Sequence, residues 1–435
     1  MEEIIRGFFI PCSAVELQVR FSVERVPIVT RWKKTMIRKA RLFTPGPTPL
    51  LPAAQLAMAG ATMHHRTGEF RALYSKVLAD LKTFIGSKND VVMFTASGTG
   101  AMEAAVSNLT SPGDKVLVVS SGKFGERWES LVKTYGCQVE TVRAPYGDSV
   151  TPQQIKEKLK PDHVAVYMQA TESSTGVRLD VEGVARLVAG TNTLLVVDAI
   201  TGLGTTAFDV DGWGVDVIIG GSQKAVMIPP GLAFAAISDR AWQRMETTRN
   251  PRYYFDLRKE RKNGAKGESS YTPSTALVAG LSTALDFLRE QGGGDLAKGR
   301  EALVRNAETA AAMTRAAVQA LGLKLFSRGA PGAALTAIAS PDGIDSGDIV
   351  KNLRNRFGAV IANGQGEMKG MLFRIAHLGL YDYLDTIAII GALEHTLIEI
   401  GKEVELGTGL RAAQRVYAEL WSARAVGSLS VSKTL

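Results

Sequence analysis

The sequence predicts an α/β protein: a large domain with a mostly parallel, doubly wound sheet, followed by a smaller α+β domain. From about residue 90, short apolar runs bounded by glycine and polar turns alternate with helical stretches. This alternation is typical of buried parallel strands connected by helices. The chain also has 435 residues, more than a single hydrophobic core usually organises.

The elements of the large domain are expected in a regular order. Helices are predicted at residues 100–109 and 126–135. Strands are predicted at residues 91–94, 115–120, 163–168, 193–198, 215–220 and 232–238. Because crossovers between parallel strands are right-handed, this order predicts a doubly wound sheet.

The pattern changes near residue 275. A helix is predicted at residues 276–290, and an alanine-rich helix at residues 300–321 follows three glycines. Short strands then alternate with helices to about residue 400. This change indicates a second domain.

Four segments are therefore expected along the chain. Residues 1–40 are expected to form a flexible extension, with a targeting peptide as the weaker alternative. The segments are an N-terminal extension (1–40), a large domain (41–290), a small C-terminal domain (291–405) and a C-terminal helix or tail (406–435).

The net charge of +8 does not by itself indicate a nucleic-acid partner. The basic residues are dispersed, and the densest runs, at residues 31–41 and 258–262, lie in no recognisable binding motif. Such a charge favours anionic small molecules. We also expect no membrane partner, since no stretch approaches the roughly 18 apolar residues of a membrane span.

Only two cysteines occur, Cys12 and Cys137. They are too few for a disulfide framework or a cysteine metal site, and their scarcity fits a reducing, cytoplasmic location. The five histidines include one close pair, His64 and His65, which is not a convincing metal site. We therefore expect no metal.

Three expected strand ends carry residues that fit one site, because ligands of open parallel sheets bind beyond the carboxyl ends of the strands. Residues 97–101 (SGTGA) join a strand to a helix, so backbone N–H groups there can approach a phosphate. Asp198 ends an apolar strand and should face a cation or a cleft. Lys224 follows another strand in apolar surroundings, where a desolvated lysine can act as a nucleophile.

Each of these features also has a plainer interpretation: a tight turn, a turn aspartate and a surface lysine. Their combination fits pyridoxal 5'-phosphate (PLP). The phosphate of PLP needs N–H donors, its aldehyde needs an amine, and its ring nitrogen needs an anion. The sequence therefore predicts a PLP site at this edge of the sheet.

The sequence resembles the class V aminotransferases of PLP fold type I, particularly the alanine–glyoxylate and serine–glyoxylate branch. The resemblance extends from about residue 43 to residue 400. The motifs that carry it are TPGPT (44–48), HR (65–66) with EF (69–70), SGTG (97–100), ESSTG (172–176), the Asp198 strand, GSQKA (221–225) and FRIAHLG (373–379).

The resemblance implies a role for each matched residue. Lys224 would form the Schiff base and carry the proton, and Asp198 would pair with the ring nitrogen. Arg374 would bind the substrate carboxylate, for which a forked guanidinium is suited, with Gly46 beside the substrate. The other cofactor contacts would be Thr99, Gly100, Ala101 and Gln223 at the phosphate, Phe124 on the ring face, Ser173 near the phenolic oxygen, and Thr272, contributed by a partner subunit.

Two positions depart from the family pattern. Relatives often have tryptophan at the stacking position and histidine after the phosphate-turn glycine, where this chain has Phe124 and Ala101. Phenylalanine still stacks, and binding through backbone N–H groups does not depend on the side chain. The departures therefore concern substrate preference more than cofactor binding.

The expected function is ping-pong transamination from a small amino acid, alanine or serine, to a small 2-oxo acid, glyoxylate or pyruvate. A 2-aminoethylphosphonate-type transaminase and a non-catalytic partner-binding protein of the same fold stay as alternatives. A cysteine desulfurase is disfavoured, since Cys12 lies in the extension and Cys137 precedes a strand. A nucleic-acid-binding role is more distant still.

A homodimer is also expected. Residues 249–268 form a basic stretch that contains Tyr253, Tyr254 and Phe255. Its composition suits a loop that forms an active-site wall between subunits. A solvated loop is the competing interpretation.

Overall fold

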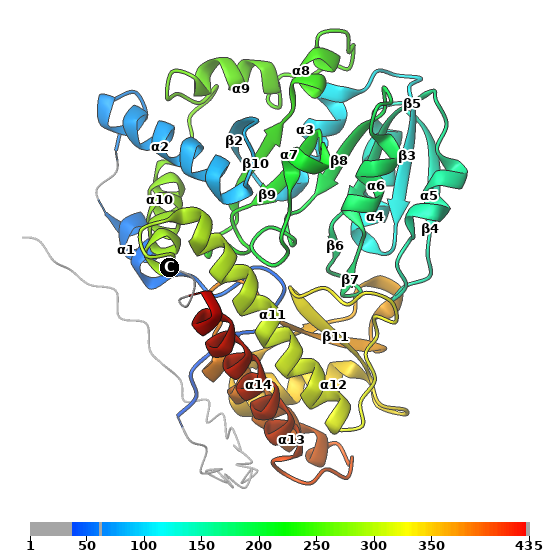
Figure 1. The fold of residues 1–435 in the computed structure, drawn as a ribbon, viewed down its shortest axis with the longest axis vertical. Coiled ribbons are helices and arrows are strands. Elements are labelled where there is room, and N and C mark those ends of the chain that lie inside the picture. The colour runs from blue at the N-terminus through cyan, green and yellow to red at the C-terminus, as the bar shows by residue number, and fades with distance from the viewer. Residues whose placement is uncertain (1–36, 61–62, 432–435) are drawn as a thin grey trace, which may run out of the picture. The chain divides into compact units, whose positions relative to one another are not determined.

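The computed structural model describes residues 37–60 and 63–431, with side chains as far as residue 422 (Figure 1). From Lys39 onward these residues belong to one compact unit. The expected extension over residues 1–40, including Cys12, lies almost wholly outside the described residues. The domain boundaries expected at residues 290 and 405 stay predictions.

A seven-stranded sheet organises the first part of the unit, in the order β2-β10-β9-β8-β5-β3-β4. Six strands run in one direction, and β10 is antiparallel to both of its neighbours. The strands are β2 (Asp90–Ala96), β3 (Lys115–Ser120), β4 (Gln138–Arg143), β5 (His163–Gln169), β8 (Leu194–Asp198), β9 (Val217–Gly221) and β10 (Gly231–Ile237).

Every strand predicted in this part of the chain is present. The apolar run at residues 232–238 was expected to be parallel, as the other runs are, and this direction is wrong for β10. The physical reason is that β10 is buried on both faces between two strands. Composition therefore reports its burial but not its direction.

Helices cover both faces of the sheet. Alternate strand residues point to opposite faces, so Leu117 and Val119 join one core and Val116 and Val118 join the other. The first core includes α2 (Gly68–Ile85), α5 (Pro152–Lys158), α6 (Val181–Val188) and α10 (Thr275–Gln291). The second includes α3 (Gly98–Leu109), α4 (Lys123–Thr134) and α8 (Asp239–Met245).

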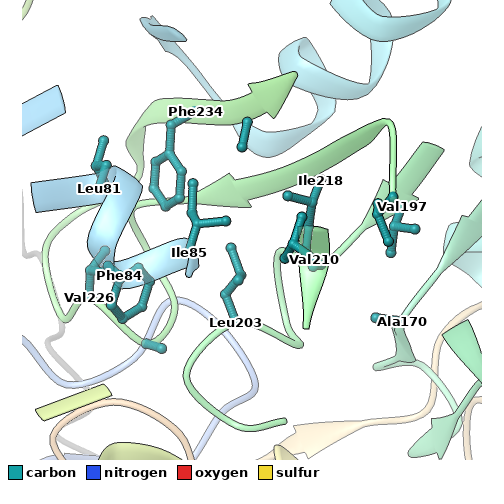
Figure 2. Packing of buried hydrophobic residues seen from close by; sticks show 14 of the residues in the cluster. Leu81, Phe84, Ile85, Ala170, Val197, Leu203, Val210, Ile218, Val226 and Phe234 are labelled. Atoms are coloured by element: carbon teal, nitrogen blue, oxygen red, sulfur yellow. The ribbon is translucent and has the colours of Figure 1, made fainter. Parts of the chain in front are cut away.

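Figure 2 shows part of the first core, where Phe84 and Ile85 of α2 lie among side chains from the sheet. The ring of Phe234 on β10 is buried in this core. A Cβ at Gly220 on β9 would lie 2.1 Å from that ring. The missing side chain therefore lets Phe234 pack against the strand that leads to Lys224.

The remaining elements form a second sheet with its own core. β14 (Leu372–Ala376) lies between β11 (Leu335–Ala339) and β13 (Ala362–Asn363), and all pairs are antiparallel. Around this sheet lie α11 (Leu296–Ala320), α12 (Ser346–Asn352), α13 (Tyr383–Glu399) and α14 (Thr408–Val431), with α14 packed along α11 (Figure 1).

Two short strand pairings and several small helices lie outside these two sheets. β1 (Arg41–Leu42) pairs with β12 (Ala359–Val360), so the start of the described chain lies beside the C-terminal elements. β6 (Thr171–Glu172) pairs with β7 (Val177–Arg178). The small helices are α1 (Pro52–Ala59), α7 (Val210–Trp213) and α9 (Leu257–Gly264).

The expectation of a loop over residues 249–268 is wrong in part, because α9 lies within it. Asp256 caps this helix by accepting from the N–H groups of Arg258 (3.1 Å) and Lys259 (3.2 Å). Leu257 is buried in the second core. A polar composition therefore concealed a capped helix held by one apolar anchor.

No helix among the described residues combines the length and apolarity needed to cross a bilayer.

We predict that Gly220→Ala destabilises the protein by about 1–3 kcal/mol, because the added methyl group forces the Phe234 ring out of its packed position. In a Phe234→Leu background the same change should be less destabilising, since the two side chains are in contact. Urea unfolding of the four variants measures this coupling. Gly68→Ala, whose new Cβ would meet no atom within 4 Å, is the control. Equal losses in both backgrounds would contradict the packing explanation.

Candidate active site

The carboxyl ends of β2, β8 and β9 meet around the side chain of Ile200. A Cβ at Gly98 would lie 2.3 Å from Ile200 Cδ1, and one at Gly221 would lie 3.3 Å from Ile200 Cγ2. Because both glycines lack a side chain, the three strand ends approach one another closely. The structure thus brings together the phosphate turn, the Asp198 strand end and the Lys224 loop.

The expected phosphate turn is the N-terminus of α3. Its N-cap residue, Ser97, makes no side-chain hydrogen bond to the helix. Thr99 is half-buried, and Gly100 and Ala101 are buried. A Cβ at Gly100 would lie 2.7 Å from Ala96 Cβ and 3.0 Å from the Phe255 ring. Glycine is therefore needed there for packing, whereas the exposed start of the helix offers partial positive charge to an anion.

Lys224 lies between β9 and β10, and its side chain is 8% exposed. Its amine donates a hydrogen bond to the carbonyl of Pro45, and Thr48 Oγ1 donates to the Lys224 carbonyl at 2.9 Å. Burial lowers the pKa of the Lys224 amine to about 8, with Asp198 opposing this change and Arg374 and Arg127 adding to it. A substantial fraction of this amine is therefore neutral near pH 8.

Gly46 forms the wall opposite the lysine. Its φ is +138°, and a Cβ there would lie 2.5 Å from Lys224 Nζ and 2.8 Å from Cε. This backbone conformation and this space both require glycine. Gly46 therefore lies against the lysine itself, which is more direct than its expected place beside the substrate.

Asp198 ends β8 and is 6% exposed. Its Oδ1 accepts a hydrogen bond from the N–H of Ile200 at 2.9 Å. Burial raises the pKa of Asp198 to about 6, an effect that the Ile200 N–H and Lys224 oppose and the charge of Glu172 reinforces. The carboxylate is thus ionised at neutral pH and lies in the same electrostatic field as Lys224.

Arg374 projects from β14 of the second sheet and is buried. Its Nη1 donates to the carbonyl of Ser173 at 2.7 Å and its Nη2 to the carbonyl of Asn363 at 2.5 Å. Its Nε is also buried but has no partner among the described residues. Burial lowers the pKa of Arg374 to about 10, against the attraction of Glu172. The guanidinium therefore stays charged and keeps unused donors for an anion.

Glu172 is a buried carboxylate for which the sequence suggested no separate role. Its Oε2 accepts from the N–H groups of Phe124 (3.1 Å) and Gly125 (3.2 Å), at the start of α4. Its Oε1 accepts from the N–H of Ser174 at 3.1 Å. Burial raises the pKa of Glu172, and these hydrogen bonds oppose the rise. Glu172 therefore fixes the Phe124 turn against the segment that contains Ser173.

Arg127 is a second residue that the sequence reasoning missed. Its Nη1 donates to Thr99 Oγ1 at 3.0 Å, and its Cζ lies 4.7 Å from the centroid of the Phe124 ring. The spacing of three residues between Phe124 and Arg127 on a helix is the only sequence signal for this contact. The contact with Thr99 joins α4 to α3, and only the fold reveals it.

The last two expected cofactor contacts differ in their positions. Gln223 is half-buried, and its buried amide Oε1 has no partner among the described residues. Thr272 is exposed and lines a small cavity with Thr95, Tyr254 and Tyr271. Its expected role, in the site of a partner subunit, stays a prediction.

The residues at this edge fit PLP. Arg374 Nε and Gln223 Oε1 are buried polar atoms with no partner among the described residues, as a site built around a polar ligand requires. A half-turn of the Gln223 amide presents its NH₂ to a phosphate oxygen. Lys224, Asp198 and the start of α3 supply the amine, the anion and the N–H donors that the aldehyde, ring nitrogen and phosphate need.

No group of three or more histidine, cysteine or acidic side chains that could hold a metal ion occurs in the described part of the chain. Cys137 is half-buried, and burial raises the pKa of its thiol. Cys137 precedes the first residue of β4, whereas Asp198 is the last residue of β8. Because these strands run in the same direction, the two residues lie at opposite ends of the strands.

We predict that Gly46→Ala lowers turnover at least about tenfold, because the new methyl group meets the amine that must react and the backbone is strained. Steady-state rates with an amino acid and glyoxylate measure this effect. Gly113→Ala, at φ +89° with no atom within 4 Å of the added Cβ, is the control for backbone strain alone. Similar losses in both variants would remove the steric explanation.

Comparisons with known proteins show the family of the chain. Residues 53–373 match the family described as Aminotransferase class-V. Over 386 residues the chain is 39% identical to a Synechococcus protein named soluble hydrogenase, small subunit, covering 87% of this chain and 98% of that protein. It is 33% identical to the L-aspartate–glyoxylate aminotransferase of Paracoccus denitrificans, with 88% and 97% covered.

Two further relatives extend the comparison. The serine–glyoxylate aminotransferase of Methylorubrum extorquens is 33% identical, over 87% of this chain and 96% of that protein. The crystal structure of a Thermus thermophilus aspartate aminotransferase of subgroup IV is 33% identical, with a TM-score of 0.76 over 83% of this chain and 99% of that chain. With a family match across most of its length, the chain belongs to the class V aminotransferases, which are PLP enzymes of fold type I.

Proposed function

We propose that this aminotransferase moves an amino group from a small amino acid to glyoxylate or a similarly small 2-oxo acid. One observation carries the proposal: Lys224 lies close enough to Asp198 and Arg374 for both charges to change the pKa of its amine. Arg374 reaches this site by donating a hydrogen bond to the Ser173 carbonyl. This set supplies an amine, an anion and a carboxylate-binding cation. The names of the relatives, which include aspartate– and serine–glyoxylate aminotransferases, support glyoxylate as the acceptor.

The residues divide the binding of the cofactor among them. The backbone of Gly100 and Ala101, with the side chains of Thr99 and Gln223, would hold the phosphate. Phe124 would lie against one ring face, Ser173 near the phenolic oxygen, and Asp198 at the ring nitrogen. When bound, PLP provides the electron sink for the reaction.

Lys224 holds and moves the proton. Its lowered pKa would let the amine accept a proton from the substrate Cα near neutral pH and, within the same half-reaction, deliver a proton to the cofactor carbon that keeps the nitrogen. Arg374 binds the substrate carboxylate through donors that Ser173 and Asn363 leave free. Because two backbone carbonyls hold the guanidinium, the substrate Cα is presented in a fixed position.

The donor is proposed to be alanine, serine or aspartate. Arg374 recognises the α-carboxylate that all three share, so the side-chain preference depends on other residues. No observation favours a phosphonate substrate or a non-catalytic role. One relative carries the name of a soluble hydrogenase subunit, whereas the amine, anion and guanidinium gathered here support transamination.

We also propose a homodimer located in the cytoplasm. Tyr253 and Tyr254 are 79% and 45% exposed, and the Tyr254 ring stacks on that of Tyr271 with centroids 4.9 Å apart. An exposed aromatic cluster next to the phosphate turn suits a subunit interface. From there, Thr272 of each subunit would reach the phosphate site of the other.

We predict that Lys224→Ala retains noncovalent PLP binding but loses at least about a thousandfold in turnover, since no other amine replaces Lys224.

In the wild-type protein, the rate of PLP incorporation should rise as pH increases through about 8, because the amine becomes neutral above its pKa. Absorbance spectra and a matrix of donors against glyoxylate and pyruvate test both points. A wild-type protein that binds PLP but transfers no amino group would contradict the proposal.

We further predict that sedimentation equilibrium gives a dimer and that Tyr253→Glu weakens it at least about tenfold, because a charge would be buried in an aromatic contact. Leu384→Glu, at a position 70% exposed on α13, is the control. A fully active wild-type monomer would disprove the dimer.

A further inference from the structure

Arg127 lies at the cofactor edge of the sheet, and its charge is unpaired in the described chain. Its side chain is half-buried in the first turns of α4. The groups that it contacts, the Thr99 hydroxyl and the Phe124 ring, are both neutral. Among the described residues, no carboxylate lies within ion-pair distance of it. The Asp198 carboxylate acts on the Arg127 charge only from beyond ion-pair distance, so the guanidinium keeps donors that a ligand can use.

Two other half-buried arginines have acidic partners, whereas Arg252 and Arg315 donate to backbone carbonyls. Arg244 pairs with Asp114, and Arg289 pairs with Asp80 at 2.5 Å. The guanidinium of Arg127 instead rests on Thr99, in the first turn of α3. The start of that helix also attracts anions. Two independent sources of positive potential therefore meet at one point.

A phosphate fits this point better than a carboxylate. Arg374 already provides a guanidinium for a carboxylate and is held by carbonyls of the Ser173 segment and β13. Arg127 is bound to the turn whose N–H groups suit a phosphate. A forked guanidinium can share a phosphate with these N–H groups through charge-assisted hydrogen bonds.

We propose that Arg127 binds the phosphate of the cofactor, adding a full positive charge to the N-terminus of α3. This inference rests on the proposed PLP site. Arg127 also contacts the ring of Phe124, so one side chain links the residue against the cofactor ring to the residues around its phosphate.

The test compares two ligands that differ only in the phosphate, PLP and pyridoxal. Equilibrium dissociation constants of the cofactor-free full-length protein are measured for both. For Arg127→Gln we expect PLP binding to weaken about 10- to 100-fold, the range for one charge-assisted contact, with pyridoxal binding unchanged. Inorganic phosphate should raise the melting temperature of the cofactor-free wild-type protein but not that of Arg127→Gln.

Arg356→Gln is the control, although Arg356 differs from Arg127 in forming an ion pair with Glu399. Arg356 also lies over an adjacent aromatic ring, that of Phe357, with Cζ 5.0 Å from the centroid, but on the C-terminal side of the molecule. It should leave both dissociation constants unchanged. Far-UV circular dichroism verifies folding, and if Arg127→Gln does not fold, Arg127→Lys replaces it, because lysine keeps the charge but loses the paired donors.

Equal weakening of PLP and pyridoxal, or no change in either, would overturn the inference and leave Arg127 a structural residue. An increase in the KM for the amino acid at unchanged PLP affinity would also overturn it and assign Arg127 to the substrate. If the wild-type protein binds neither ligand, the proposed PLP site itself fails. That result is distinct from a failure confined to Arg127.

Discussion

The amine of Lys224 is largely withdrawn from water between Gly46 and the end of β9, and an ionised amine there is unfavourable. Burial lowers the pKa of this amine, while Asp198 limits the fall. The same burial raises the pKa of Asp198 without neutralising it at pH 7. The site is arranged around this balance, since an amine that must react has to lose its proton near neutral pH.

Glu172 is a second buried carboxylate whose pKa is raised by burial. By accepting hydrogen bonds from N–H groups at the start of α4 and from Ser174, it holds the Phe124 turn against the Ser173 segment. The neighbouring carbonyl of Ser173 then holds Arg374 of the second sheet. A chain of buried polar contacts thereby connects the two sheets, and each member is satisfied largely by backbone groups.

The fold was largely predictable because burial leaves a clear mark on composition. Each buried strand of the central sheet appeared as an apolar run, and the long helices α10 and α11 appeared with ends within a few residues of those observed. The direction of β10 and the presence of α9 were not recoverable. Strand direction depends on the connections, and α9 depends on one cap and one buried leucine.

By itself, the sequence determined the chemistry of the strand ends, because the carboxyl ends of parallel strands converge wherever such a sheet forms. Asp198, Lys224 and the turn at Thr99 were therefore identifiable in advance. Only the tertiary structure decided which side chains hold them. Arg127 meets Thr99 across 28 residues and Glu172 meets the Phe124 backbone across 48, contacts that no local pattern encodes because they depend on how helices pack on the sheet.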